Sequence, residues 1–433
     1  MFEVFRNAWK DTNLRKKILY TLFIIVIFRL GSNIFVPFLD MSVISDLMGD
    51  ESLLSFLDTM TGGSLSNGTL LAMSITPYIN ASIIIQLLAV AIPALEKLQK
   101  EGDEGRKKLN TITKLTSLGL AIFQAIGFYA LLNVRGAVKY GLDQGFSGIL
   151  AAITIVICFV AGASLIIWLG DQINEKGIGN GISIILFAGI IARAPSSVFS
   201  LIQSMSADMK NAILVPVVGI IFVVMIGLVV LMTNAERRIP VQYAKRVVGR
   251  KMYGGQSTFI PIKVAMAGVM PIIFAMSVMA LPQTICSFFG IYGDGSSGND
   301  FWEGFVRLFS QSSWLYAILY FLLIIAFNYF YIAIQYNPVE IANNLKKNNG
   351  AIPGIRPGKP TSDFIQNSLS KISLIGAMFL AFIAIFPIIF RQLSGINIAL
   401  GGTTMLILVG VALETVRSLE SQMMMRHHKG FLE

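Results

Sequence analysis

The sequence predicts an all-α, polytopic membrane protein with ten transmembrane helices in two inverted five-helix halves. Of its 433 residues, 55% are hydrophobic and 13% are charged, whereas a soluble domain carries about 25% charged residues. About ten apolar stretches approach the length of roughly 20 residues that a helix needs to cross a bilayer. Basic residues are also concentrated in alternate connecting segments, a pattern that a soluble fold does not require.

This charge distribution predicts the orientation of the chain. If the N-terminus is inside, the inside segments hold 27 of the 34 Lys and Arg residues and 14 of the 24 Asp and Glu residues. The outside segments hold seven basic and ten acidic residues, so the two sides carry net charges of +13 and −3. Because basic segments resist translocation, both termini are predicted to be cytoplasmic.

The predicted elements divide the chain into four parts. Residues 1–17 are expected to form a short basic amphipathic helix on the inner membrane surface. The N-terminal half then covers residues 18–203, the C-terminal half residues 204–420, and a cytoplasmic tail residues 421–433. The predicted spans lie at about residues 18–37, 69–93, 115–134, 148–169, 181–203, 212–233, 263–289, 314–334, 371–390 and 399–418.

Five spans in each half require the second half to enter the membrane with the opposite orientation, which is the plan of an inverted repeat. The second span of each half carries a proline between apolar residues, at Pro77 and at Pro271. Proline interrupts the helical hydrogen-bond ladder, so both helices are predicted to be kinked or broken there. Broken helices in a membrane usually line a cavity.

One face of the second span changes from apolar to polar along its length. Ile75, Ile79, Ser82 and Gln86 are spaced to lie on one helical face. The stripe is compatible with an apolar constriction above a wetter cytoplasmic vestibule. Ordinary packing, with the Ser and Gln side chains bonded to neighbouring helices, explains the same spacing.

The segment before the second span, LLSFLDTMTGGSLSNG, contains an apolar run that is too short to cross the bilayer. Such a piece can re-enter the bundle and act as a movable stopper. A plain surface loop is equally consistent with these residues.

A search for catalytic or metal-binding patterns gives no candidate. The chain lacks a GxxxxGK[ST] phosphate loop, and its only histidines are His427 and His428 in the tail. Cys158 and Cys286 fall in apolar spans and form no CxxC pattern. The sequence therefore predicts no catalytic activity, no cofactor and no metal site.

Ionisable residues are sparse in the predicted spans. Arg29 lies toward the outer end of the first span, and Glu414 and Arg417 are three residues apart in the last, where they can pair. Ion-coupled carriers usually need buried carboxylates or a proton relay. An inverted-repeat secondary transporter for a small solute is therefore the alternative rather than the main prediction.

Two long cytoplasmic loops, residues 234–262 and 335–366, mix Lys and Arg with Gly, Pro and apolar residues. The first is predicted to form a hairpin near Gly249 and Gly254, and the second to present Arg356 rigidly. Basic prominences of this kind suit large acidic partners such as ribosomal RNA or a motor protein. Control of topology and contact with anionic lipids account for the same residues.

Several long motifs, in the same order, are similar to those of the SecY family, the central subunits of bacterial protein-translocation channels. The resemblance covers essentially the whole chain and rests on MTGGSLSNGTLLAMSITPYINASIIIQLL, KEGDEGRKKL, EKGIGNGISIILFAGI, YAKRVVGRKMYGGQSTFIPIK, NNLKKNNGAIPGIRPGKPT and LGGTTMLILV. It implies a central pore between the two halves through which unfolded polypeptide passes. It also implies lateral release of signal or transmembrane helices into lipid between the second and seventh spans.

The resemblance assigns roles to particular residues. The implied apolar pore ring comprises Ile75, Ile79, Ile182, Leu186, Ile273 and Leu408. The implied plug lies near residues 54–68 and includes Leu54, Phe56, Leu57, Met60, Gly62, Gly63 and Leu65. The implied lateral gate includes Asn80, Ile83, Gln86, Leu87, Ile272, Met276 and Met279.

The resemblance also implies partners and a location. The expected partners are the SecE and SecG subunits, the SecA motor ATPase, the ribosome, signal sequences, nascent polypeptides and membrane lipids. The expected location is the bacterial cell membrane. The implied motor and ribosome contacts are Arg237, Arg238, Lys245, Arg246, Arg250, Lys251, Lys346, Lys347, Arg356 and Lys359.

Overall fold

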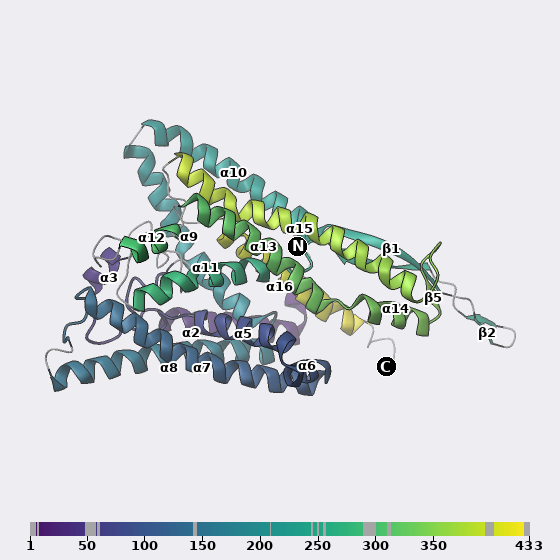
Figure 1. Cartoon of the computed structure of the whole chain (residues 1–433), viewed down its shortest axis with the longest axis horizontal. Helices are drawn as coiled ribbons and strands as arrows, with labels where there is room; N and C mark the ends of the chain where they lie inside the picture. Colours follow the sequence, from purple (N-terminus) through teal and green to yellow (C-terminus); the bar gives the residue numbers. More distant parts are fainter. Residues whose placement is uncertain are drawn as a thin grey trace.

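The computed structural model is predominantly helical and elongated (Figure 1). It describes residues 6, 8–47, 58, 61–141, 145–207, 209–243, 246–248, 251–253, 257–288, 300–309, 313–394 and 402–427. A helix of the described chain overlaps each predicted span. These helices are α2 (Thr12–Gly31), α5 (Thr76–Ala91), α7 (Asp103–Val134), α8 (Phe146–Lys176), α9 (Gly181–Ala207), α10 (Met209–Asn234), α11 (Met270–Phe288), α13 (Trp314–Gln335), α15 (Lys359–Ser394) and α16 (Gly402–His427).

Six helices of the described chain are long and apolar enough to cross a membrane. The number becomes seven if α5 and the short α6 (Pro93–Lys100), which meet at an angle of 107°, count as one bent span. Helices α2, α11 and α16 are not among them. Ten membrane crossings therefore remain a prediction, although the helices stand where the sequence places them.

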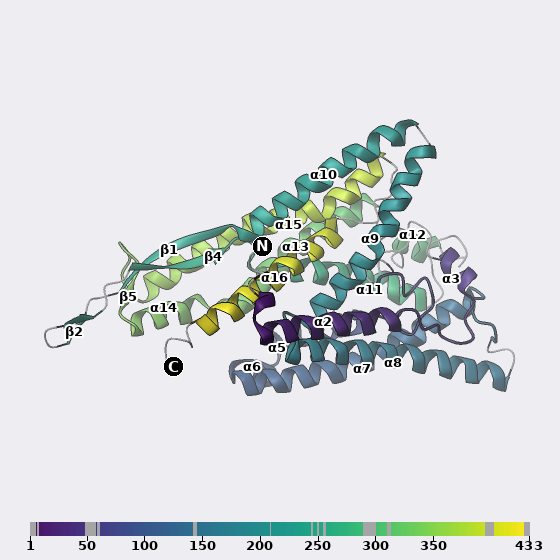
Figure 2. The same cartoon turned by 180° about the vertical axis from the view of Figure 1, so that it is seen from behind.

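The helices form two groups that meet along a seam. Helices α2, α5, α7 and α8 lie on one side of the molecule, and α10, α13 and α15 lie on the other (Figures 1 and 2). Helices α9, α11 and α16 lie between them, and α16 contacts α9, α10 and α15. One buried apolar cluster fills the first group, another fills the second, and a third lies at the seam.

The two prolines stand at helix starts rather than at kinks inside long helices. Helix α5 begins at Thr76 and α11 begins at Met270, so Pro77 and Pro271 each occupy the first turn. Residues 61–75 and 264–269 are mostly turns instead of helix. Of the two predicted outcomes, the structure shows a break at each proline and not a kink. A proline in the first turn loses no intrahelical hydrogen bond, because its missing N–H would have no partner there.

Helix boundaries differ from the predicted spans where polar residues continue a helix. The predicted boundary between a surface helix and the first span, at residue 17, falls inside α2. Helix α2 begins after Asp11, and the Asp11 carboxylate caps it by accepting a hydrogen bond from the N–H of Asn13 at 2.8 Å. The predicted loop 94–114 is also largely helical, because α6 and the start of α7 occupy it. Hydropathy marks only the apolar part of a helix, and residues such as Glu, Lys and Leu extend it.

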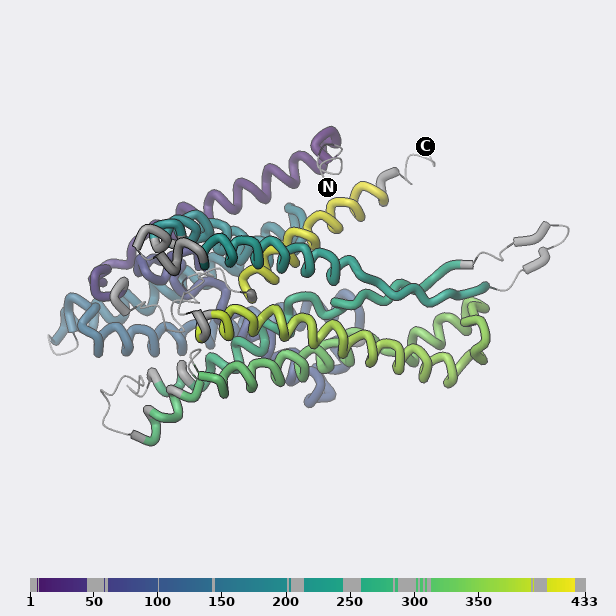
Figure 3. Tube along the Cα trace, turned by 90° about the horizontal axis from the view of Figure 1, so that it is seen from above, coloured from purple at the N-terminus to yellow at the C-terminus, as the bar shows by residue number. Residues whose placement is uncertain are grey.

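The two long basic loops fold together into one prominence at one end of the molecule (Figure 3). The first loop forms the predicted hairpin, in which β1 (Glu236–Tyr243) pairs antiparallel with β4 (Ser257–Lys263). Strands β2 (Arg246–Val248) and β3 (Lys251–Tyr253) pair farther out. The second loop contributes α14 (Pro338–Lys347) and β5 (Gly350–Ala351), and β5 pairs with β1.

The opposite end of the molecule carries two short helices. Helix α3 (Met41–Leu47) follows α2, and α12 (Asp300–Leu308) lies between α11 and α13 in the chain. Figures 1 and 2 show both at the end remote from the hairpin. Helices α2 and α16 have their chain-terminal ends toward the hairpin side of the bundle (Figure 3).

Candidate functional site: an apolar seam and the polar segment beside it

The seam between the two helix groups is filled by aliphatic side chains, which we call the central cluster. It receives residues from helices α2, α8, α9, α11 and α16, and from the turns that precede α5. Its buried members are Ile24, Phe28, Leu71, Ile75, Ile166, Leu169, Ile173, Ile184, Ile185, Leu186, Ile190, Ile273, Ile407 and Val411. All of these members are aliphatic apart from Phe28, so their own side chains carry no charge and no hydrogen-bonding group.

The structure brings all six residues of the implied pore ring into the central cluster. Ile75, Leu186 and Ile273 are buried members, with relative exposures of 1%, 4% and 7%. The other three are partly buried and pack against the cluster: Ile79, Ile182 and Leu408. They come from both halves of the chain, since α5 and α9 precede α10 whereas α11 and α16 follow it. Their role as a pore ring remains a prediction.

A polar segment lies beside the cluster, and we define it as residue 58 together with residues 61–69. Most of it forms successive turns. Its Ser and Thr hydroxyls satisfy its own backbone carbonyls, as when Ser64 donates to Thr61 O at 2.9 Å and Thr69 donates to Ser64 O at 2.9 Å. Thr61, Ser64 and Thr69 are all buried. This internal bonding allows a polar segment to sit inside an apolar bundle.

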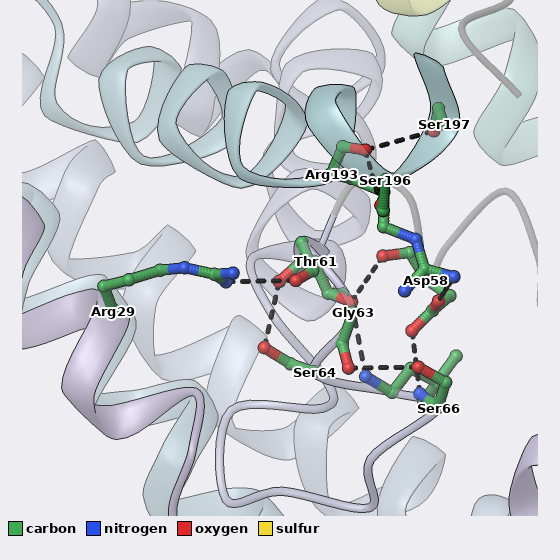
Figure 4. Close-up of polar contacts among 11 residues, drawn as sticks. Arg29, Asp58, Thr61, Gly63, Ser64, Ser66, Arg193, Ser196 and Ser197 are labelled. Carbon is green, nitrogen blue, oxygen red and sulfur yellow. Dashed lines mark hydrogen bonds and ion pairs between the residues drawn. The ribbon is translucent and has the colours of Figure 1, made fainter. Parts of the chain in front are cut away.

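Two arginines from different helices hold the polar segment (Figure 4). The guanidinium of Arg29, on α2, donates to Gly62 O at 3.0 Å. The guanidinium of Arg193, on α9, lies 2.8 Å from the Asp58 carboxylate, whose side chain is only 1% exposed. The other Asp58 oxygen accepts the N–H of Ser66 at 2.7 Å. The segment is therefore fixed to α2 and α9 at the edge of the seam.

Glycine is required where the polar segment approaches α9. Gly62 has φ +69°, in the left-handed region that disfavours residues with a Cβ atom. A Cβ atom at Gly62 would lie 2.9 Å from Gly189 O of α9. At Gly63, with φ +88°, a Cβ atom would lie 2.8 Å from the Arg193 guanidinium. A larger residue at Gly62 would displace the segment from α9, whereas one at Gly63 would displace the Arg193 guanidinium.

The structure covers only part of the implied plug. Gly62, Gly63 and Leu65 lie in the polar segment and are buried, and Leu65 packs in the cluster of the N-terminal helix group. The remaining members of the implied plug fall outside the described residues: Leu54, Phe56, Leu57 and Met60.

The implied lateral gate lies on α5 and α11, which contact each other at the seam. Ile83 is buried on α5, whereas Leu87 is 39% exposed and Asn80 is intermediate. On α11, Ile272 and Met279 are buried and Met276 is partly buried, all in the cluster of the C-terminal helix group. The Gln86 amide donates to the Ser82 hydroxyl at 3.1 Å, so these two polar residues bond to each other within α5.

The implied motor and ribosome contacts lie on the prominence. Arg237 and Arg238 are exposed on β1, and Arg238 pairs with Glu236 at 2.8 Å and lies 4.7 Å from the centre of the Phe259 ring. Arg246 and Lys251 are on β2 and β3. Lys245 and Arg250 lie outside the described residues. The second loop contributes four of the implied contacts, and all four are exposed: Lys346, Lys347, Arg356 and Lys359.

The joining of the two loops was not predicted from the sequence. Strand β1 carries β5 on its second edge, with Gln242 opposite Ala351. A small apolar core beneath the sheet contains Ile239, Val241, Ile262, Leu345, Ile352, Ile365, Leu369 and Ile372. The signal available in the sequence was the alternation of apolar Ile239 and Val241 with Arg238 and Gln242 along β1. The basic residues of β1 and of the second loop therefore share one support.

Three charged contacts were also missed or differ from the prediction. The Asp58–Arg193 pair joins residues far apart in the sequence. Lys114 of α7 and Asp171 of α8 form a second ion pair at 2.7 Å. Arg417, predicted to pair with Glu414, instead donates to Thr233 O and to the side chain of Asn234, both at 2.8 Å. Terminal carbonyls of α10 lack helical partners and attract this guanidinium.

Within the described residues, no group of three or more His, Cys, Asp and Glu side chains is placed to hold a metal ion. One open polar cavity of about 410 Å³ lies where the α8–α9 turn meets α2 and α16. Its lining includes Lys17, Glu175 and Glu414, and Lys17 donates to Gln422 at 3.1 Å. The central cluster and the polar segment remain the most developed candidate site.

Comparison with known proteins gives consistent results across sequence and structure. The SecY family model matches residues 69–416. The protein translocase subunit SecY of Mycobacterium tuberculosis is 40% identical over 456 residues, covering 100% of both chains.

Two solved structures show the same fold. One is a structure of SecY, whose plug domain is described as stabilising the closed state of the translocation channel and maintaining a membrane seal. Its TM-score is 0.65 at 20% sequence identity, and the match covers 95% of this chain and 93% of that chain. The other is Sec61 in the canine ribosome-channel complex from the endoplasmic reticulum, with a TM-score of 0.61 at 18% identity and the same coverages. Agreement along the full length, in a fold with two helix groups and an aliphatic seam, leads to one conclusion: the chain belongs to the SecY family, a family of multi-pass proteins of the bacterial membrane.

Proposed function

We propose that this chain is the channel subunit of a bacterial protein translocase, which passes unfolded secretory polypeptides across the membrane. The observation that carries the proposal is the central cluster, in which aliphatic residues from both halves of the chain meet at one seam. The relatives are protein translocase subunits, which favours a protein channel over a carrier for a small solute.

The seal follows from the chemistry of the central cluster. A narrow constriction of aliphatic side chains dewets, so it blocks ions and water when no polypeptide is present. The same side chains offer no fixed hydrogen bonds to a passing chain, so segments of different sequence can slide through. We infer that Ile75, Ile79, Ile182, Leu186, Ile273 and Leu408 form this constriction.

The polar segment is the proposed plug, beside the constriction on the outer side. Its burial and its contacts to α2 and α9 support a seated position in a closed channel. A signal helix would open the channel by binding the open arrangement better than the closed one. We infer that it leaves between α5 and α11, because these helices come from opposite halves and contact each other at the seam.

The prominence is the proposed docking site for the partners that supply energy, with both termini on the same, cytoplasmic side. Its exposed Arg and Lys residues suit acidic surfaces, including ribosomal RNA and the SecA motor ATPase. The solved Sec61 relative is a ribosome-channel complex. SecE and SecG are the proposed small membrane subunits, and lipids surround the exposed apolar faces of the helices.

Reconstitution tests this function directly. The channel, purified with its small subunits, is placed in lipid vesicles with the motor ATPase, ATP and a preprotein that carries a signal sequence. We expect the preprotein to become protected from added protease, and a preprotein with a disabled signal to remain accessible. Accumulation of small solutes without any protection of the preprotein would contradict the proposal.

A further inference from the structure

The contact between the polar segment and α9 is an ion pair with an uneven environment. The Asp58 side chain is 1% exposed, whereas the Arg193 side chain is 37% exposed. The Asp58 oxygen that faces Arg193 has no aligned hydrogen-bond donor among the described residues, so opposite charge provides the attraction. The carboxylate therefore depends on Arg193, while part of the Arg193 side chain lies on the accessible surface.

Because Asp58 is buried and Arg193 is partly exposed, separating the pair costs the two side chains different amounts of free energy. A buried carboxylate without its cation is costly, because the desolvation of the charge is no longer offset. A guanidinium that is already partly accessible loses much less. Separation is therefore tolerated only if Asp58 also becomes hydrated, which requires the polar segment to leave its seat.

A second contact holds the same segment from the opposite side. Arg29 of α2 donates to Gly62 O, and the backbone around Gly62 lies against Gly189 of α9. Figure 4 shows the two arginines reaching the segment from different helices. Movement of α2 relative to α9, or of the segment relative to either, breaks at least one of these contacts.

We propose that Asp58, Arg193 and Arg29 form a latch that holds the polar segment seated in the closed channel, and that opening breaks the Asp58–Arg193 ion pair. These are positioning residues, since they act through the segment. The inference rests on the proposed channel function and adds to it the charged contacts that set the balance between closed and open states.

The burial of Asp58 predicts an order among variants. Arg193→Gln leaves a buried carboxylate unpaired, so we expect the largest effect, an increase in resting ion conductance of about tenfold or more in planar bilayers. Asp58→Asn keeps an oxygen for the Ser66 N–H and leaves only a partly hydrated guanidinium, so its increase is smaller. The double variant, which has no unpaired buried charge, should resemble Asp58→Asn rather than exceed Arg193→Gln.

Cysteine labelling measures the accessibility of the polar segment directly. Ser64 is 1% exposed, so Ser64→Cys, in a chain whose native Cys158 and Cys286 are replaced by serine, should react slowly with a water-soluble maleimide. Adding Arg193→Gln should speed this labelling about tenfold, in proportion to the open population. Lys114→Gln is the matched control, because it removes the 2.7 Å ion pair with Asp171 and should leave labelling and conductance unchanged.

The outcomes separate the latch from the channel function. If wild-type vesicles transport preprotein but Arg193→Gln and Asp58→Asn both keep wild-type conductance and labelling, the latch is wrong and the channel stands. If wild-type vesicles transport nothing while labelling still rises in Arg193→Gln, the latch contact stands and the proposed function fails. Should Arg193→Gln fail to fold, the milder Asp58→Asn variant decides by the same two measurements, with Arg193→Lys expected to stay closed.

Discussion

Individual aliphatic side chains close the seam. How strongly each one favours the closed state depends on whether lipid or water would replace its contacts. Lipid tails are as apolar as isoleucine, so contact with lipid costs these side chains little. Contact with water is different, because fully burying one such side chain contributes about 1.5–3 kcal/mol relative to exposure. A water-filled opening along the central cluster is therefore disfavoured over a packed one, and Ile75, Leu186 and Ile273 contribute most because they are buried.

Ile79→Asn tests this seal. The amide places a hydrogen-bonding group at the edge of the central cluster, where Ile79 packs, and should stabilise water there. We expect the resting conductance in planar bilayers to rise several-fold. Ile84→Asn is the matched control, because Ile84 lies on the same helix but is 40% exposed on its outer surface. Equal conductance of the two variants would count against the assignment of the constriction.

At the scale of elements, α5 and α11 share features that agree with the predicted inverted repeat. Each begins with a proline in its first turn, and each follows a stretch of turns rather than a full-length helix. Each also contributes a side chain to the central cluster near its start, Ile79 from α5 and Ile273 from α11. Because these helices belong to different halves, their contact can open without disrupting the packing within either half.

Crosslinking tests whether this contact opens during transport. Cysteines scanned along α5 and α11, in a chain without native cysteines, identify a pair that forms a crosslink in the closed channel. We expect the crosslink to abolish transport of a preprotein into vesicles and reduction of the bond to restore it. A pair joining α5 to α7, which pack together within one half, should leave transport intact. Undiminished transport through the crosslinked α5–α11 pair would exclude lateral opening there.

The apolar elements could be predicted from the sequence because hydropathy has a long, local signal. The spans near α10 and α13 match within a few residues, and the hairpin of the first basic loop was predicted from its glycines. Helix α6 and the first turns of α7 were missed because their polar residues favour helix through intrinsic propensity and leave no apolar period. Hydropathy also placed Pro77 inside a span, since it does not distinguish a helix start from a kink.

The residues of the candidate site also include some that were predicted and some that were not. The six aliphatic residues of the central cluster were named through resemblance to a family, because spacing along single helices does not show which helices meet. The Asp58–Arg193 pair was not predicted, since nothing local to either residue identifies a partner so distant in the chain. Only the fold brings α9 against the turns that precede α5.

Across the whole molecule, the basic residues of the two long loops lie at one end, while the seam and the polar segment lie in the helical body. The prominence unites β1, β4, α14 and the start of α15 around a small apolar core, so the charges of β1 and of the second loop share one support. Charge complementarity at such a surface mainly changes the rate of association and its dependence on salt. A partner that docks there can act on the helices directly, because β1 and β4 continue from α10 and lead into α11.

Arg356→Glu tests this surface. Arg356 is exposed between β5 and α15, and the reversal of its charge should weaken attraction to an acidic partner without disturbing the core. We expect motor-dependent transport to fall about fivefold at low salt, and the difference from wild type to shrink at high salt, where exposed charges are screened. Lys108→Glu is the control, since it makes the same change at an exposed position on α7, outside the prominence. An equal loss of transport in both variants would show that the effect comes from the change in net charge alone. Normal transport by Arg356→Glu would show that Arg356 is not part of the docking surface.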